Sequence, residues 1–302
     1  MKKKDNKILI ATSSFNSYKN KDLNKSLNSL NVVFNPFKKK LNKIELKKII
    51  INNNIKYIIA GLEEYDSEII NSTNIKIISR LGSGISNIDQ KEARLKNIKV
   101  FSTPKGPIEA VSELTLSMMI TMIRDVYDMN NNMHKNYWHR EQGNLLSGKT
   151  VLIIGYGRIG KHLKKLLSNF NVNVIICDKV KRKNKNLKYM SLKKALPKSD
   201  IITFHTNTEK EIMGKDEFRL LKKGVIICNS SRGSVINEKE IIKYVKNKVI
   251  KKIWLDVFND EPYSGQMSKY KNIILTPHIG SFTRETRQKM EIQDLKNITE
   301  NF

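Results

Sequence analysis

The stretch VLIIGYGRIGKHLKKLLSNFNVNVIICD, from Val151 to Asp178, decides the fold of this chain. It opens with a short apolar run rich in β-branched residues and continues through a glycine-rich turn into a segment with apolar residues at helical spacing. It closes on a second apolar run that ends in a carboxylate. The apolar residues of the middle segment are Leu163, Leu166, Leu167 and Phe170. This order predicts a strand, a helix and a second strand, the βαβ unit of a parallel sheet.

The turn in this stretch spells G-x-G-x-x-G, with its glycines at Gly155, Gly157 and Gly160. The first glycine permits the tight turn, the second lets a pyrophosphate approach bare backbone, and the third lets the helix pack close to the strand. The following helix N-terminus presents N–H groups and partial positive charge to phosphates. Asp178 lies 18 residues beyond Gly160, where an acceptor for the adenosine ribose hydroxyls is expected. The stretch therefore predicts a dinucleotide site that favours NAD, because an acid repels the 2′-phosphate of NADP.

Basic residues outnumber acidic ones, with 56 Lys plus Arg against 29 Asp plus Glu and a formal net charge of +27. The lysines are spread over predicted helices and loops among many Asn and Ile, as a compositional bias would leave them. No specific nucleic-acid partner is therefore expected, although a basic surface should attract anionic substrates. Lys179, Lys181 and Arg182 follow Asp178 closely and leave some tolerance of NADP open.

The composition, with 39% hydrophobic and 28% charged residues in 302, is that of a globular protein long enough for two domains. The most apolar helical candidate, 114–123, is too short to cross a membrane, and the apolar segment near the start is too short for a signal peptide. The two cysteines, Cys177 and Cys228, fall in predicted buried strands without metal-ligand spacing. We expect a cytoplasmic protein with no membrane segment and no metal site.

Strands and helices alternate along the whole chain, which predicts an α/β fold of two doubly wound parallel-sheet domains. Residues 1–103 contain no G-x-G-x-x-G and are expected to form a flavodoxin-like substrate domain, to which a helical tail at 282–302 returns. Residues 104–281 are expected to form a Rossmann NAD-binding domain with six strands. One long helix is predicted from Glu109 to about His134, followed by a polar loop with Trp138 as its anchor.

Polar residues follow four predicted strands of the second half, where ligands of open α/β sheets lie. They are His205-Thr206, Ser231-Arg232-Gly233, the segment 256–262, and Pro277-His278. Arg232 carries a two-pronged donor suited to a carboxylate, although a surface arginine in a turn is the plainer interpretation. His278 can exchange a proton near neutral pH, although a lone histidine after a strand is more often structural. Glu261 favours the catalytic interpretation, because a carboxylate beside the imidazole would orient it and stabilise its protonated form.

These residues resemble a known family. NSSRGSVIN around Arg232, DVFNDEP around Glu261 and TPHIG around His278 are similar, in order and spacing, to the Arg, Glu and His motifs of the D-isomer-specific 2-hydroxyacid dehydrogenases. The likeness covers almost the whole chain: ISRLGSGISNID, 78–89, resembles the family's substrate loop, and SELTLSMM the helix that crosses into the nucleotide domain. Ser79-Arg80 before the Gly-Ser-Gly turn is most like the phosphoglycerate dehydrogenase branch.

The resemblance implies NAD as cofactor and a homodimer whose interface includes the 109–134 helix and the loop after it. It implies that N–H groups of Ser83 and Gly84 hold the substrate carboxylate. Arg80 is the candidate for binding a substrate phosphate, although an arginine there could equally form a structural ion pair. Arg232 would bind the carboxylate and polarise the carbonyl, while His278, kept protonatable by Glu261, exchanges the hydroxyl proton. The residues expected to contact the cofactor are Tyr156, Gly157, Arg158, Ile159, Asp178, His205, Thr206, Ser231, Asp256, His278 and Gly280.

The substrate expected first is 3-phosphoglycerate, the starting point of serine biosynthesis. A reductase of hydroxypyruvate, glyoxylate or a sugar-derived 2-keto acid is the alternative, and an NADH-responsive binding protein is an alternative of another class. The sequence departs from the family's pattern at Asn207, where proline is usual, and at Ser86, where Asp is common. Since the sequence ends at Phe302, feedback inhibition through a serine-binding regulatory domain is not expected.

Overall fold

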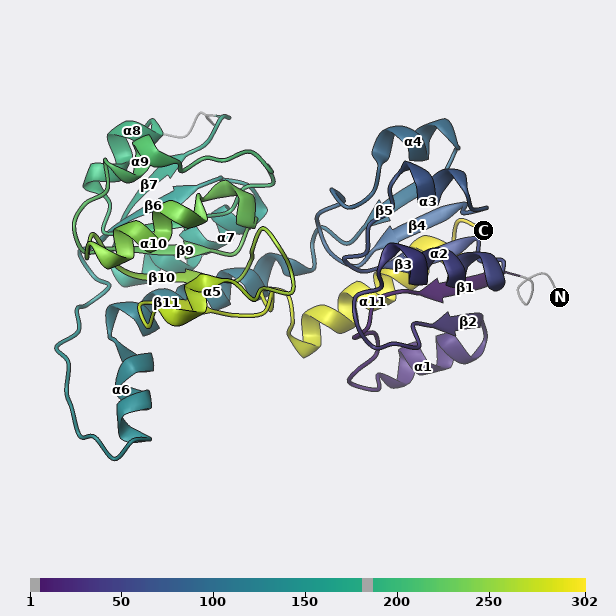
Figure 1. Ribbon diagram of the computed structural model, residues 1–302, viewed down its shortest axis with the longest axis horizontal. Helices are drawn as coiled ribbons and strands as arrows, with labels where there is room; N and C mark the ends of the chain where they lie inside the picture. Colours follow the sequence, from purple (N-terminus) through teal and green to yellow (C-terminus); the bar gives the residue numbers. More distant parts are fainter. Residues whose placement is uncertain (1–5, 181–186) are drawn as a thin grey trace. The chain divides into compact units, whose positions relative to one another are not determined.

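The computed structural model describes residues 6–180 and 187–302, which belong to two compact units (Figure 1). Unit 1 consists of Met1–Pro107 and Ser281–Phe302, and unit 2 of Ile108–Gly280. Each unit is a parallel β-sheet with helices on both faces, so the expected α/β class with two doubly wound sheets is confirmed.

The sheet of unit 1 has five strands in the order β2-β1-β3-β4-β5, the flavodoxin-like order. All neighbouring strands in it are parallel, as βαβ connections require. Its elements are β1 (Lys7–Ile10), α1 (Lys21–Asn28), β2 (Asn31–Phe34), α2 (Lys43–Asn52), β3 (Tyr57–Ala60), α3 (Ser67–Asn71), β4 (Ile77–Arg80), α4 (Gln90–Leu95), β5 (Lys99–Ser102) and α11 (Arg284–Thr299).

Two helical layers bury the faces of this first sheet. On one face, α2, α3 and α4 place Leu46, Ile69 and Ala93 against the strands. On the other, α1 and the C-terminal helix α11 contribute Leu27 and Ile298. The prediction of a helical tail is thus confirmed, and α11 packs within unit 1.

The sheet of unit 2 has six strands in the order β11-β10-β9-β8-β6-β7, all parallel. The chain order reverses between β6 and β8, which makes this the switch point where such sheets bind ligands. Its elements are α5 (Pro107–Ile123), α6 (Val126–Met133), β6 (Thr150–Ile154), α7 (Arg158–Leu167), β7 (Asn173–Cys177), α8 (Leu192–Ala195), β8 (Ile201–Phe204), α9 (Lys215–Phe218), β9 (Val225–Asn229), α10 (Glu238–Lys246), β10 (Ile250–Leu255) and β11 (Ile273–Leu275).

Strand β6 shows how the second core is built. Its successive side chains alternate between faces, so Leu152 and Ile154 pack in the cluster that contains residues of α8, α9 and α10. Val151 and Ile153 pack in the opposite cluster, with residues of α5 and α7. Because both faces are buried, the strand reads as a continuous apolar run in the sequence.

The prediction of one long helix from Glu109 to about His134 is wrong, because the helix breaks at Asp125. This residue adopts a left-handed φ of 53° and separates α5 from α6. Its buried carboxylate forms ion pairs with Lys251 at 2.8 Å and with Lys252 at 2.9 Å. Lys252 lies in β10 and is itself buried, so an unpaired ammonium there would be costly. A tertiary ion pair therefore overrides the helical periodicity.

Beyond the break, the segment 126–147 projects from the body of unit 2 as an arm (Figure 1). Helix α6 has no buried residue. The arm exposes large apolar side chains, including Tyr127, Met133, Tyr137 and Trp138, the last 76% exposed. Among the described residues, no helix is long and apolar enough to cross a membrane.

Candidate active site

The glycine-rich turn after β6 has the geometry of a phosphate cradle. Gly155 adopts a φ of 94°, and a Cβ there would lie 2.5 Å from the His205 carbonyl oxygen. A Cβ on Gly160 would lie 2.3 Å from the Gly155 oxygen, so both positions require glycine. Among the described residues, a Cβ on Gly157 would meet no heavy atom within 4 Å, and no side chain caps the N-terminus of α7. The turn is thus open where a pyrophosphate would lie, beside the positive end of a helix.

Asp178 follows β7 and is tied to this turn. Its Oδ2 accepts a hydrogen bond from the Tyr156 N–H at 2.5 Å, and its Oδ1 accepts one from the Val180 N–H at 2.8 Å. A carboxylate has about four lone-pair sites, so it retains acceptors for ribose hydroxyls. Lys181 and Arg182, which bear on NADP tolerance, lie outside the described residues.

His205 and Thr206 follow β8 and line the other side of the turn. The His205 ring is buried with its Nε2 2.9 Å from the Thr203 hydroxyl, and burial lowers its pKa to about 3. The His205 ring is therefore neutral at physiological pH and is not suited to act as a general acid. The buried Thr206 hydroxyl has no hydrogen-bond partner among the described residues. A buried hydroxyl left unpaired beside the cradle fits contact with a bound cofactor.

Arg232 follows β9 and is held by its own loop. The Arg232 Nη1 donates to the Ser231 carbonyl at 2.7 Å, and the Asn229 side chain donates to the Arg232 carbonyl at 2.8 Å. The Arg232 Nε donates to Glu209 at 3.0 Å. The sequence did not predict a role for Glu209. In the sequence, a glutamate of a polar loop that binds an arginine looks the same as one that only faces solvent.

His278 and Glu261 lie together after β11 and β10. The His278 Nδ1 is 2.8 Å from the Glu261 Oε2, and the Glu261 Oε1 accepts from the Phe258 N–H at 3.1 Å. His278 takes a left-handed φ of 53°, an uncommon conformation for a side-chain-bearing residue. Because a carboxylate can only accept, the Nδ1 carries the proton and the Nε2 is the nitrogen available to a substrate.

Asp256 fixes the loop that carries His278. Its buried carboxylate accepts from the Thr276 hydroxyl at 2.5 Å, the Ile279 N–H at 2.9 Å and the Gly280 N–H at 2.7 Å. Burial raises the pKa of Asp256, while these hydrogen bonds oppose that shift. Cofactor contact by Asp256 and Gly280 stays a prediction; the hydrogen bonds show that Asp256 anchors the turn beside His278.

The predicted substrate loop lies in unit 1, after β4. Gly82 has a φ of 140°, and a Cβ there would lie 1.3 Å from the Arg80 Nη1, so the guanidinium is folded over the loop. That nitrogen donates to the Leu81 carbonyl at 2.8 Å. Ser83 is exposed and Gly84 is half-exposed.

Behind this loop is a buried cluster of charged groups contributed by α11. The Asp294 carboxylate accepts a short hydrogen bond from the buried Ser79 hydroxyl, and its second oxygen has no partner among the described residues. Arg287 pairs with Glu291 at 3.2 Å in the same cluster. Burial raises the pKa of Asp294 to about 7, against the opposing effects of Ser79, Arg80 and Arg287.

Replacing Asp294 with Asn is expected to stabilise the protein at pH 8 by up to about 4 kcal/mol, since folding raises the carboxyl pKa from 3.8 to about 7 and each pKa unit corresponds to about 1.4 kcal/mol. A carboxyl whose pKa is raised by folding contributes stability that is fully present below its unfolded value, 3.8, and is lost as the pH rises to about 7. The effect should therefore be about fourfold smaller at pH 4.5, and it should vanish only below the unfolded value. Urea unfolding at the two pH values measures it, with the exposed Glu285→Gln on the same helix as control; equal effects at both pH values would contradict the prediction.

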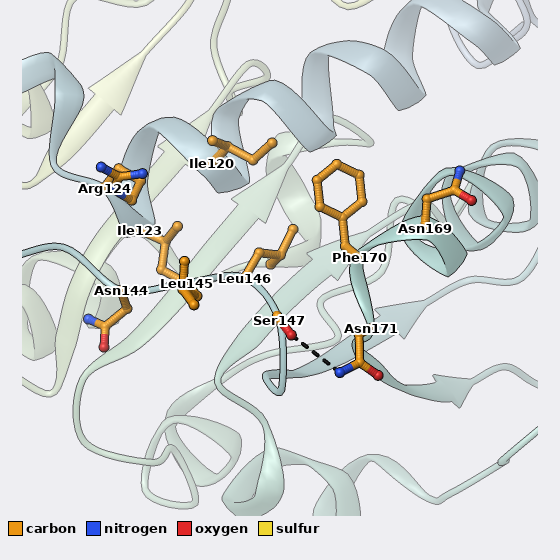
Figure 2. A pocket seen from close by; sticks show the side chains of 10 residues that line it. All are labelled: Ile120, Ile123, Arg124, Asn144, Leu145, Leu146, Ser147, Asn169, Phe170 and Asn171. Carbon is orange, nitrogen blue, oxygen red and sulfur yellow. Dashed lines mark hydrogen bonds between the residues drawn. The ribbon is translucent and has the colours of Figure 1, made fainter.

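A separate open cavity of about 390 Å³ lies at the base of the arm (Figure 2). Apolar side chains, among them Ile120, Ile123 and Phe170, form its walls, and Asn144, Asn169 and other polar groups line its rim. None of the predicted site residues lines it. It is therefore a feature of the surface around α5 and the arm, and not of the catalytic site.

Residues 116–280 match the model of the D-isomer specific 2-hydroxyacid dehydrogenase NAD binding domain. A hydroxypyruvate reductase of Thermotoga maritima is 30% identical over 85% of this chain and 88% of its own. A D-3-phosphoglycerate dehydrogenase of Archaeoglobus fulgidus is 31% identical over 76% of this chain but only 46% of its own.

The fold is similar to the crystal structure of a glyoxylate reductase from Paecilomyes thermophila. The TM-score is 0.83 at 24% identity, over 98% of this chain and 94% of that one. Domain match, sequence relatives and fold agree, so the chain belongs to the D-isomer-specific 2-hydroxyacid dehydrogenases and is an NAD-dependent oxidoreductase.

Proposed function

We propose that the protein interconverts a small 2-keto acid, of the hydroxypyruvate and glyoxylate type, with its D-2-hydroxy acid. The observation that carries this proposal is the 2.8 Å contact between His278 and Glu261, at the strand ends of the same sheet that positions Arg232 and the glycine-rich turn. An acid–base pair, a carboxylate-binding arginine and a dinucleotide cradle are the components that hydride transfer to a keto acid requires.

Arg232 has the role of substrate anchor. Its planar guanidinium offers parallel N–H donors that match a carboxylate, and a further donor can polarise the adjacent carbonyl oxygen. Negative charge develops on that oxygen during reduction, so a fixed cation there stabilises the transition state more than the ground state.

His278 has the role of general acid and base. In reduction its protonated Nε2 gives a proton to the forming hydroxyl oxygen, and in oxidation the neutral Nε2 takes that proton back. Glu261 holds the ring by the Nδ1, so the same nitrogen faces the substrate in both directions. The carboxylate also stabilises the imidazolium formed during oxidation.

The cofactor site comprises the turn 155–160, Asp178 and the strand ends that follow it in the sheet. When bound, NAD supplies the redox chemistry by accepting or returning hydride at C2 of the substrate. In this proposal the turn binds the pyrophosphate, Asp178 binds ribose hydroxyls, and Thr206, Ser231, Asp256 and Gly280 lie near the nicotinamide end. The role of the Ser83 and Gly84 N–H groups toward the substrate carboxylate stays a prediction from the sequence.

The environment of Arg80 favours an unphosphorylated substrate over the 3-phosphoglycerate that the sequence suggests first. Both buried Glu63 and buried Asp294 interact with the charge of Arg80, and the Arg80 Nη1 is bonded to a carbonyl. An arginine engaged in this way is a weaker phosphate anchor. 3-Phosphoglycerate stays the second candidate, because Arg80 lies over the loop and a phosphoglycerate dehydrogenase is among the relatives.

NADH oxidation at 340 nm tests the choice, with glyoxylate, hydroxypyruvate, 3-phosphohydroxypyruvate and pyruvate compared at equal concentration and repeated with NADPH. A higher kcat/KM for hydroxypyruvate or glyoxylate supports the proposal. A gain from the phosphate would establish the second candidate. Absence of turnover with all four, despite NADH binding, would favour the binding-protein alternative.

We also propose that the arm and the outer side of α5 form the interface of a homodimer. The arm exposes apolar side chains that nothing in the described chain covers, and contiguous exposed apolar surface marks interaction sites. Tyr127 and Trp138, 47% and 76% exposed, are suited to anchor such an interface.

The double replacement Tyr127→Glu and Trp138→Glu is expected to convert the dimer to a monomer, because two charges would be buried in an apolar contact. Sedimentation velocity measures the change. The matched control is Ile44→Glu, which changes a 79% exposed side chain on α2. A wild-type protein that sediments as a monomer would refute the proposal.

A further inference from the structure

A carboxylate that belongs to none of the predicted site motifs holds the substrate-binding arginine. Glu209, on the loop after β8, bridges to the loop after β9 through both of its oxygens. The Oε1 accepts from the Arg232 Nε at 3.0 Å, and the Oε2 accepts from the Ser234 hydroxyl at 3.1 Å. Two neighbouring strand ends are thus joined at the residue that meets the substrate.

Some N–H donors of Arg232 are therefore used within the protein, and the others are left for a ligand. The Nε donates to Glu209, and one N–H of the Nη1 donates to the Ser231 carbonyl at 2.7 Å. Among the described residues no other acceptor bonds the guanidinium, so the Nη2 and the second N–H of the Nη1 remain for a ligand. With its Nε side fixed, the guanidinium presents its end-on pair of donors, which suits the two oxygens of a carboxylate.

Stability alone does not account for the pair. The Glu209 side chain is 52% exposed and that of Arg232 is 27% exposed, and ion pairs at such positions contribute little to folding. The geometric consequence is larger, because a long arginine side chain otherwise samples many rotamers and loses them on binding substrate.

We propose that Glu209 is a positioning residue that pre-orients Arg232 for the substrate carboxylate. This rests on the role proposed above for Arg232. Glu209 itself is not required to touch the substrate, so its effect passes through the arginine. Ser234 supports the arrangement by holding the second oxygen of Glu209.

The test is a set of four variants assayed with glyoxylate and hydroxypyruvate, with oxamate as an unreactive anionic competitor. Glu209→Ala is expected to lower kcat/KM about 10-fold or more and to weaken oxamate inhibition similarly, since misplacing a substrate-orienting group is costly. Glu209→Gln keeps an acceptor for the Nε and should stay within about 3-fold of wild type, because only the charge of a surface pair is lost. Ser234→Ala should lower kcat/KM in the same direction but less than Glu209→Ala.

Glu211→Ala is the matched control. Glu211 lies two residues further on the same loop and accepts from the Asn237 side chain at 2.9 Å, away from Arg232. Its loss removes the same charge and should leave both kinetic constants unchanged. NADH affinity and thermal midpoint are expected to be unaltered in all four variants.

Two results would overturn the inference. If Glu209→Ala raises kcat/KM or strengthens oxamate inhibition, Glu209 competes with the substrate for Arg232. If Glu209→Ala equals wild type while Arg232→Lys is inactive, Arg232 is positioned without it. Retained activity in Arg232→Ala would instead refute the role of the arginine, so the two failures are distinguishable.

Discussion

Replacing His278 with Ala is expected to lower kcat by about 10²–10⁴, the usual contribution of a general acid or base. The Nε2 is the ring nitrogen available to the substrate, since the Nδ1 is engaged by Glu261 at 2.8 Å. Without the imidazole, water must supply or accept the proton. NADH affinity should change little, because the glycine-rich turn and Asp178 are formed by other strands of the sheet.

Steady-state kinetics and NADH fluorescence titration together measure this result. His278→Gln is the matched variant, because its amide can still donate to Glu261 but does not titrate near neutral pH. Both variants should lose turnover and keep NADH binding. Simultaneous loss of both properties would indicate a structural role for the histidine, and turnover within about tenfold of wild type would refute its catalytic role.

Replacing Arg232 with Lys is expected to lower kcat/KM by about 10²–10³, comparable to removing a donor to a developing oxyanion. Lysine retains the positive charge but has no planar fork, so it cannot serve the carboxylate and the carbonyl oxygen in one geometry. The loss should appear in KM for the keto acid and in kcat, because one group acts on both ground and transition states.

The comparison with Arg232→Ala separates charge from geometry. If Lys restores most of the activity that Ala loses, charge alone is sufficient and the fork is unimportant. If Lys and Ala are equally impaired, geometry dominates. Unfolding by urea provides the control, since the 27% exposed side chain should contribute little to stability.

Much of the fold follows from local patterns in the sequence. The glycines of 155–160 are required by backbone approach, and apolar runs such as VLII predict buried parallel strands. The second half indeed has six parallel strands, and its polar strand ends share one edge of the sheet because all strands run the same way. The helix break at Asp125 could not be predicted, because it depends on Lys252, which is more than a hundred residues distant in the chain.

The sequence by itself therefore determined the α/β class, the dinucleotide turn and the residue types that bear on catalysis. These properties depend on residues that are close together in the sequence, or on strands that short βα connections force to run in the same direction. Only the tertiary structure decided the pairing of Glu209 with Arg232 and the proximity of Arg80 to the buried carboxyls of Glu63 and Asp294. Each of these depends on side chains from different loops meeting at one place, and their distances are set by the packing of the sheet and its helices.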